Sequence, residues 1–143
     1  MPEPVKAASG KQLQCVVVTP EKAILDVPAD FVALPLYDGE LGVLPGRAPL
    51  IGRLGYGELR IVQGNSTRRF FVDGGFVQIR NSIVTVLTSR AIPAAELKVA
   101  AAEQALEAAK KPGATPEAQE AQLKAQERAR AQLRMARRAT AEV

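Results

Sequence analysis

Histidine is absent from the 143 residues of this chain, and so is tryptophan. Without histidine, the chain has no Ser-His or Cys-His pair that could activate a nucleophile. A single cysteine, Cys15, excludes an internal disulfide and a cysteine-rich metal site. Aromatic residues make up only 4% of the chain. We therefore expect an aliphatic core, in which Cys15 is buried as a small hydrophobe.

Long apolar runs and phosphate-binding motifs are also missing. No stretch approaches the roughly 20 apolar residues that span a bilayer. Residues 1–11 lack the apolar region of a signal peptide. We therefore expect the protein to stay in the compartment in which it is made. No Gly-Lys-Ser or Gly-Lys-Thr is present, so a P-loop is excluded.

Acidic residues beside glycine are the remaining candidates for catalysis. Asp38-Gly39-Glu40 and Asp73-Gly74-Gly75 each place carboxylates at an expected turn, but aspartate favours turn geometry by itself. The sequence therefore predicts structural acids and a protein that is not an enzyme. We also expect no metal site and no cofactor.

Short runs of β-branched and aliphatic residues fill residues 12–90, separated by glycine, proline and asparagine. Such runs at regular spacing are typical of a β-sandwich or barrel, and consecutive hairpins favour antiparallel pairing. Polar turns are expected at Gly64-Asn65, Asp73-Gly74-Gly75 and Asn81. The predicted strands cover residues 13–19, 21–27, 31–36, 40–44, 55–62, 67–72, 76–80 and 82–88.

The most constrained segment is residues 38–50, Asp-Gly-Glu-Leu-Gly-Val-Leu-Pro-Gly-Arg-Ala-Pro-Leu. Its density of glycine and proline excludes a helix and a central strand. Pro45-Gly46 predicts a type II turn, because proline presets the first central position and glycine supplies a positive φ at the second. The turn should hold Asp38, Glu40 and Arg47 on an exposed rim. Local chemistry alone leaves open whether this is a plain β-corner or a binding loop.

The composition changes abruptly in the last third of the chain, where alanine and long polar residues dominate. These strong helix formers predict one helix over residues 96–111, stopped by Pro112-Gly113, and a second helix that ends near Ala139. Thr115 is the predicted N-cap of the second helix, with Pro116 at its first position. The short connection makes the two helices an antiparallel hairpin.

The predicted packing faces of this hairpin are rich in alanine. Small side chains let the helices approach closely, but they bury little area. At about 0.8 kcal/mol per buried CH2, the hairpin should be weakly held. The composition fits a hairpin that opens and one that stays closed. The predicted faces are Leu97, Ala101, Ala105 and Ala108 on the first helix and Ala118, Ala121, Ala125, Ala129, Leu133 and Ala136 on the second.

Basic residues gather on the second helix, with Glu127 nearly their only acidic neighbour. Cations late in a helix suit its dipole, and many such runs are only solvated. The more specific interpretation is an acidic protein surface as partner. Nucleic acid is disfavoured, because no aromatic residue interleaves and the charges are expected to surround the helix. These residues are Lys124, Arg128, Arg130, Arg134, Arg137 and Arg138.

Residues 39–50, Gly-Glu-Leu-Gly-Val-Leu-Pro-Gly-Arg-Ala-Pro-Leu, resemble the signature of the epsilon subunits of bacterial and chloroplast F-type ATP synthases. Arg47 stands where that family commonly has histidine. Ala131-Gln132-Leu133-Arg134 is similar to the family's late-helix sequence, and Val84-Thr85-Val86-Leu87 is similar to its last strand. The resemblance extends over residues 12–138.

The fold that the resemblance implies agrees with the one that the residues predict. It is an α+β fold, an N-terminal antiparallel β-sandwich or barrel followed by a C-terminal antiparallel α-helical hairpin. We expect a flexible lead-in over residues 1–11, a β-sandwich domain over 12–91 and a helical hairpin domain over 92–143.

The resemblance also implies partners and a role. The family's sandwich couples the gamma subunit to the c-ring for proton-driven ATP synthesis, and Asp38, Gly39, Glu40 and Leu41 would face the ring. The hairpin would reach the alpha and beta subunits, with its basic helix on beta, and inhibit ATP hydrolysis when extended. No nucleic acid is expected. The protein would be peripheral at the cytoplasmic face of the bacterial inner membrane and touch the membrane only through the complex.

Some family members bind ATP through an Asp and an Arg near the start of the hairpin. Lys98 and Ala101 stand at those positions here, so the sequence predicts no tight ATP site of that type. Two functions other than the stalk subunit remain open: an ATP-sensing module, and an unrelated β-sandwich adaptor with a basic tail for nucleic acid. The adaptor predicts binding that falls steeply with salt.

Overall fold

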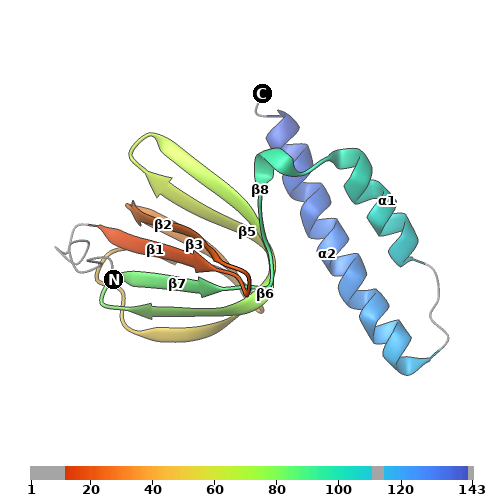
Figure 1. The fold of residues 1–143 in the computed structure, drawn as a ribbon, viewed down its shortest axis with the longest axis horizontal. Helices are drawn as coiled ribbons and strands as arrows, with labels where there is room; N and C mark the ends of the chain where they lie inside the picture. Colours follow the sequence, from red (N-terminus) through yellow and green to blue (C-terminus); the bar gives the residue numbers. More distant parts are fainter. Residues whose placement is uncertain (1–11, 111–114, 142–143) are drawn as a thin grey trace. The chain divides into compact units, whose positions relative to one another are not determined.

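The computed structural model describes residues 12–110 and 115–141, with side chains as far as Arg138. The chain divides into two compact units, Met1–Ala91 and Ile92–Val143. The first unit is built from strands (Figure 1), and the short strand β8 (Ala91–Pro93) leads on to the second. The strands of the first unit are β1 (Leu13–Val18), β2 (Ala23–Ala29), β3 (Phe31–Leu36), β4 (Gly39–Val43), β5 (Leu50–Gln63), β6 (Ser66–Arg80) and β7 (Ile83–Leu87).

The strands are hydrogen-bonded in the order β2-β1-β7-β6-β5-β3-β4. Neighbours in this order are antiparallel, except that β1 and β7 are parallel. The expected antiparallel pairing is therefore confirmed for the hairpins and wrong for this one pair. β1 and β7 can pair in parallel because they are far apart in the chain and no hairpin joins them.

The two longest strands fold the sheet into a sandwich. β5 has 14 residues and β6 has 15, and they pair along almost their whole length. β7 pairs with one end of β6, at Phe76–Arg80, whereas β3 pairs mainly with the opposite end of the β5–β6 hairpin, at Arg60–Val62. Each long strand thus runs through two layers, which face each other in Figure 1.

Alternate side chains of both layers meet in an aliphatic core, as the composition predicted. β1 alternates between buried and half-buried residues along its length, which is the pattern of a strand with one face inside. Cys15 is fully buried here, so its predicted place is confirmed. Phe70 is the aromatic member of the cluster. Further members are Leu13, Val17, Val32, Leu34, Leu59, Ile61, Val72, Val77, Ile79, Val84 and Val86.

The predicted turn at Asp73-Gly74-Gly75 is wrong, because these residues lie inside β6. Gly74 and Gly75 have positive φ values of 69° and 112°, which glycine adopts at little cost. Pairing with β5 continues on either side of them. A Cβ at Gly75 would lie 2.0 Å from the carbonyl oxygen of Leu87. The glycines therefore bend β6 close to the end of β7 without ending the strand.

The two remaining hairpin turns are confirmed. Gly64 has a φ of 59° in the two-residue turn between β5 and β6. Asn81 and Ser82 have φ values of 53° and 61° between β6 and β7. Two successive positive φ values are the mark of a type I′ turn, whose twist matches that of antiparallel strands.

The second unit contains a short 3-10 helix, η2 (Ala94–Glu96), and the helices α1 (Val99–Ala109) and α2 (Pro116–Ala141). α1 begins later than predicted, because Lys98 has extended backbone angles, φ −120° and ψ 131°. The predicted stop at Pro112-Gly113 lies outside the described residues. The predicted cap of α2 is confirmed: the Ala118 N–H donates to Thr115 Oγ1 at 3.0 Å, and Pro116 is the first helical residue.

α1 and α2 pack against each other, and the face that α1 uses differs from the predicted one. Ala102 and Ala109 are buried and Leu106 is half-buried, whereas Ala101 and Ala105 of the predicted face are exposed, as is Ala108. Alanines lie on every side of α1, so their spacing alone does not select a face. The single leucine of the helix was the more reliable marker.

The face of α2 is confirmed only in its second half. Ala129, Leu133 and Ala136 are buried, as predicted. Ala118 and Ala121 are exposed, because α2 has 26 residues and extends past the 11-residue α1. None of the helices in the described residues is long and apolar enough to span a membrane.

Candidate functional site

The β3–β4 hairpin carries the four residues that the resemblance assigns to the ring-facing loop. Tyr37 and Asp38 form its two-residue turn, while Gly39, Glu40 and Leu41 already belong to β4 rather than to a loop. Asp38 and Glu40 are exposed, as predicted for the rim. Leu41 is half-buried and packs against the core. The hairpin therefore presents two carboxylates on an anchored edge strand.

The turn after β4 is the type II turn predicted from Pro45-Gly46. Gly46 has a φ of 85°, and the Arg47 N–H donates to the carbonyl oxygen of Leu44 at 3.2 Å. The Gly46 N–H in turn donates to Ser82 Oγ at 3.1 Å. Since Ser82 lies in the β6–β7 turn, the two turns are tied together. Arg47 is thus exposed at a fixed position on the rim.

Glu40 is the first member of a chain of alternating charges. Its Oε2 lies 3.6 Å from Arg60 Nη1, and the same nitrogen lies 3.6 Å from Glu58 Oε1. Glu58 Oε2 lies 3.7 Å from Arg69 Nε. The four side chains come from β4, β5 and β6 and were not linked by any sequence pattern.

A row of exposed and half-buried apolar side chains crosses the layer that contains β1, β7, β6 and β5. Phe76 is 57% exposed and pairs across the strands with Leu87, which is 49% exposed. Leu87 pairs in turn with Val18 of β1. On β5, Phe76 pairs with Arg53, and Ile51, two residues before Arg53, is 78% exposed. We call Phe76, Leu87, Val18 and Ile51 the apolar row.

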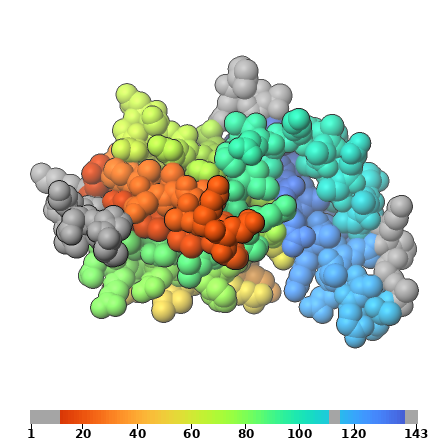
Figure 2. Space-filling view, viewed as in Figure 1, coloured from red at the N-terminus to blue at the C-terminus, as the bar shows by residue number. Residues whose placement is uncertain are grey.

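The apolar row was not predicted, although the sequence carries a signal for it. Val77 and Ile79 alternate with Phe76 along β6, so burying the first two turns Phe76 outward. Figure 2 shows β1 and β2, in red and orange, on the surface of this unit. A solvated face of an antiparallel sheet is normally polar. Large apolar side chains on it therefore indicate a surface for a partner.

We call the β3–β4 hairpin, with its exposed Asp38 and Glu40, the acidic hairpin. The apolar row meets this hairpin at one end and a hollow at the other. Arg53 pairs with Phe76, and its guanidinium lies 4.6 Å from the centre of the Tyr37 ring. The Tyr37 N–H donates to the Arg53 carbonyl oxygen at 2.8 Å, which fixes the turn that holds Asp38. The hollow, of about 360 Å³, is lined by Val18, Thr19, Pro20, Leu87, Thr88 and Ser89.

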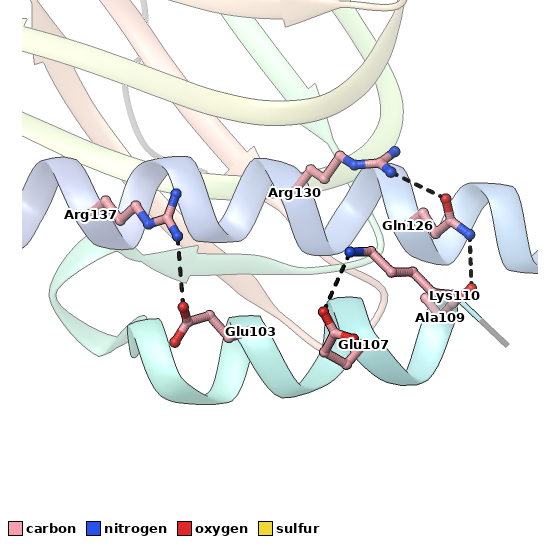
Figure 3. A network of polar contacts seen from close by, with 7 residues as sticks. All are labelled: Glu103, Glu107, Ala109, Lys110, Gln126, Arg130 and Arg137. Atoms are coloured by element: carbon pink, nitrogen blue, oxygen red, sulfur yellow. Dashed lines mark hydrogen bonds and ion pairs between the residues drawn. The ribbon is translucent and has the colours of Figure 1, made fainter.

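Polar contacts connect α2 with α1 (Figure 3). Arg137 Nη2 lies 3.7 Å from Glu103 Oε2. Near the other end of α1, Gln126 Nε2 donates to the carbonyl oxygen of Ala109 at 2.9 Å, a group that the helix itself leaves unpaired. Arg130 Nη2 donates to Gln126 Oε1 at 3.4 Å. The alanine-rich hairpin is therefore reinforced by polar contacts near the middle of α1 and at its C-terminal end.

The basic residues of α2 do not surround the helix, and that expectation is wrong. Arg130, Arg134, Arg137 and Arg138 are spaced i, i+4, i+7 and i+8, so they share one side of the helix. All four side chains are exposed. We call them the arginine stripe. Lys124 and Arg128 lie on another side, and Lys124 is 3.9 Å from Glu120.

Metal and thiol chemistry find no support in the part of the chain that the structure describes. No group of three or more His, Cys, Asp or Glu side chains there could hold a metal ion. Burial, with a smaller effect from Asp26, raises the pKa of the Cys15 thiol to about 12. A thiol that stays protonated is neither a nucleophile nor a metal ligand at neutral pH.

The sequence model for the ATP synthase, Delta/Epsilon chain, beta-sandwich domain matches residues 12–94. An ATP synthase epsilon chain of Rhodopirellula baltica is 54% identical over 126 residues, which are 87% of this chain and 98% of the relative. An ATP synthase epsilon chain of Rubrobacter xylanophilus is 34% identical over 105 residues, covering 73% of this chain and 72% of that one.

Solved structures share the fold. A chain of the Euglena gracilis mitochondrial ATP synthase superposes with a TM-score of 0.77 at 23% identity, covering 84% of this chain and 78% of that chain. A chain of the Tetrahymena thermophila mitochondrial ATP synthase gives 0.70 at 15% identity, with coverage of 87% and 96%. Together with the sequence matches, the strands and the helical hairpin assign the family. The chain belongs to the ATP synthase epsilon chain family.

Proposed function

We propose that this subunit couples the gamma subunit to the c-ring in the central stalk, and that its basic helix restrains ATP hydrolysis. The apolar row, which continues into the acidic hairpin, is the observation that carries this proposal. A protein that joins two partners needs two neighbouring surfaces of different chemistry. The first unit has such a pair, one apolar and one acidic.

The apolar row is assigned to gamma. Fully burying a side chain such as phenylalanine, leucine or isoleucine stabilises an interface by about 1.5–3 kcal/mol. Phe76, Leu87 and Ile51 lie on one sheet face, so one partner can cover all of them. The hollow beside Leu87 would receive a side chain of that partner. Contact through apolar surface should survive moderate salt.

The acidic hairpin is assigned to the c-ring. Asp38 and Glu40 are exposed on the β3–β4 hairpin, Gly39 lies between them in the chain, and the half-buried Leu41 anchors the strand to the core. Carboxylates on a fixed edge suit polar or basic loops of a partner. The Arg53–Tyr37 contact places this hairpin beside the apolar row, so gamma and the ring would be bound side by side.

The arginine stripe, with Lys124 and Arg128, is assigned to acidic surfaces of the beta and alpha subunits. Four exposed guanidinium groups on one side of a helix can pair with carboxylates two atoms at a time. Nucleic acid is a poorer partner, since residues 94–143 contain no aromatic side chain to stack on bases. The role proposed here is regulatory and not catalytic, and it places the subunit peripherally at the cytoplasmic face of the bacterial inner membrane.

The assignment of gamma is tested by measuring the affinity of the full chain for an alpha-beta-gamma complex that lacks it. Phe76→Ala combined with Leu87→Ala should weaken binding more than tenfold, because both side chains lose their buried contacts. Leu123→Ala is the matched control, since Leu123 is 60% exposed on α2. Equal affinity of both variants and the unaltered chain would refute the assignment.

A further inference from the structure

The ion pair between Glu40 and Arg60 spans an entire strand. Glu40 lies in β4 and Arg60 in β5, and β3 lies between them in the sheet. Neighbouring strands are about 4.8 Å apart, so this contact bridges about twice that distance. Ala33 of β3 is the direct partner of Arg60 in the pairing. Its small side chain leaves room for the arginine to pass over β3.

Arg60 is also held from its own strand. Glu58, two residues earlier and therefore on the same face, lies 3.6 Å from the nitrogen that contacts Glu40. Arg69 on β6 lies 3.7 Å from the other oxygen of Glu58. A planar guanidinium with five donors can serve two carboxylates at once, which an ammonium group does less well. The chain of charges thus connects the middle of the sandwich to its edge.

β4 is the edge strand that needs such support. Among the strands of the described residues it pairs only with β3, with which it forms the acidic hairpin. Glu40 is paired with Arg60, whereas in the part of the chain that the structure describes no ion pair engages Asp38. The two carboxylates of the hairpin therefore have different roles available to them.

We propose that Arg60 is a positioning residue, which fixes Glu40 and with it the angle at which the hairpin offers Asp38 to a partner. The partner surface that fits is polar or basic and meets one free carboxylate and one neutralised one. This inference rests on the proposed contact of the acidic hairpin with the c-ring. The contact of Glu58 with Arg60 holds the guanidinium in place on β5.

The test uses the catalytic complex assembled with full-length variants and membranes that hold the ring but have been stripped of that complex. Arg60→Gln should lower the affinity for these membranes about fivefold and leave binding to gamma unchanged. Arg60→Lys keeps the charge but bridges poorly, and it should recover part of the loss. Arg68→Gln removes an exposed arginine from β6 and is the matched control.

A double-mutant cycle separates positioning from a general loss of charge. Arg60→Gln should add nothing to Glu40→Gln, because each removes the same contact. Glu40→Gln should leave the unfolding midpoint nearly unchanged, since the Glu40 side chain is 57% exposed. Arg60→Gln should lower the midpoint modestly, because Glu58, whose side chain is 10% exposed, also loses its contact with Arg60. Additive effects, or an affinity that Arg60→Gln does not alter, would overturn the inference.

The same measurements distinguish this inference from the proposed function. If Asp38→Asn and Glu40→Gln weaken ring binding and Arg60→Gln does not, the ring contact stands and the positioning role is refuted. If none of the three variants changes ring binding, the hairpin does not meet the ring and both proposals fail.

Discussion

Cys15 is a residue whose chemistry is set by its burial. It is fully buried in β1, and loss of hydration, with a smaller effect from Asp26, raises its pKa to about 12. We expect iodoacetamide to leave Cys15 unmodified at pH 8 in the folded protein and to modify it once urea unfolds the chain. Mass spectrometry measures the fraction modified. Rapid modification without urea would contradict the buried placement.

The same shift predicts how stability depends on pH in the alkaline range. Above its ordinary pKa of 9.0, the thiol ionises in the unfolded chain but stays protonated in the folded one until about pH 12. The unfolded state then binds fewer protons, so stability falls as pH rises through this window, by up to about 1.4 kcal/mol per pH unit. Cys15→Ala should lose this slope in urea titrations at several pH values.

Alanine substitutions at Gly46 and Gly75 distinguish the cost of backbone strain alone from the cost of strain together with a steric clash. Gly46 has a φ of 85°, and a Cβ there would meet nothing within 4 Å, so Gly46→Ala should cost about 1–2 kcal/mol. Gly75 has a φ of 112°, and its Cβ would lie 2.0 Å from the Leu87 carbonyl oxygen. Gly75→Ala should therefore cost more than about 3 kcal/mol. Urea unfolding measures both, and equal costs would mean that the end of β7 moves aside.

At the scale of elements, features determined by neighbouring residues could be predicted from the sequence. The Pro45-Gly46 turn and the Thr115 cap each depend on chemistry within four residues, and both are present. Features determined by distant segments could not. The parallel pairing of β1 with β7 and the passage of β6 through Gly75 depend on strands that meet only in the folded protein.

In the candidate site, too, features set by neighbouring residues could be predicted and contacts between distant segments could not. The exposure of Asp38 and Glu40 was predicted from the Pro45-Gly46 turn, which follows β4, and both side chains are exposed. Arg60 could not be predicted as the partner of Glu40, because their contact crosses β3 and no sequence spacing marks residues that meet across an intervening strand. The charge pattern of α2 is different, because helical periodicity alone places Arg130, Arg134 and Arg137 on one side of the helix. The expectation of charges all around the helix did not follow from the spacing.

The hairpin itself is held by few large side chains, and this predicts which leucine matters. Leu133 is 7% exposed between alanines of the packed face, whereas Leu123 is 60% exposed on the same helix. Leu133→Ala should destabilise the hairpin by about 2–3 kcal/mol, and Leu123→Ala by less than about 0.5. Far-UV circular dichroism during thermal unfolding reports the helical loss. Equal effects would show that the helices do not pack through Leu133.

At the scale of the whole molecule, the chain combines a unit with a large packed core and a unit that buries mainly small side chains. The first unit has a continuous aliphatic core and carries the apolar row and the acidic hairpin. The second buries mostly alanines and relies on the Gln126–Ala109 hydrogen bond and the Glu103–Arg137 pair. Exposed ion pairs are weak, so an acidic partner can compete with Glu103 for Arg137.

This competition predicts how the arginine stripe acts on ATP hydrolysis. Added to a catalytic complex that lacks it, the full chain should lower the hydrolysis rate, and a chain ending at Pro93 should bind without lowering it. Replacing Arg130, Arg134, Arg137 and Arg138 by glutamine should remove most of the inhibition, because these exposed cations lose their carboxylate partners. Replacing them by lysine keeps the charge and should retain part of it. If the full and shortened chains both bind and neither changes the rate, the stripe has no inhibitory role and the subunit acts as a structural coupler alone.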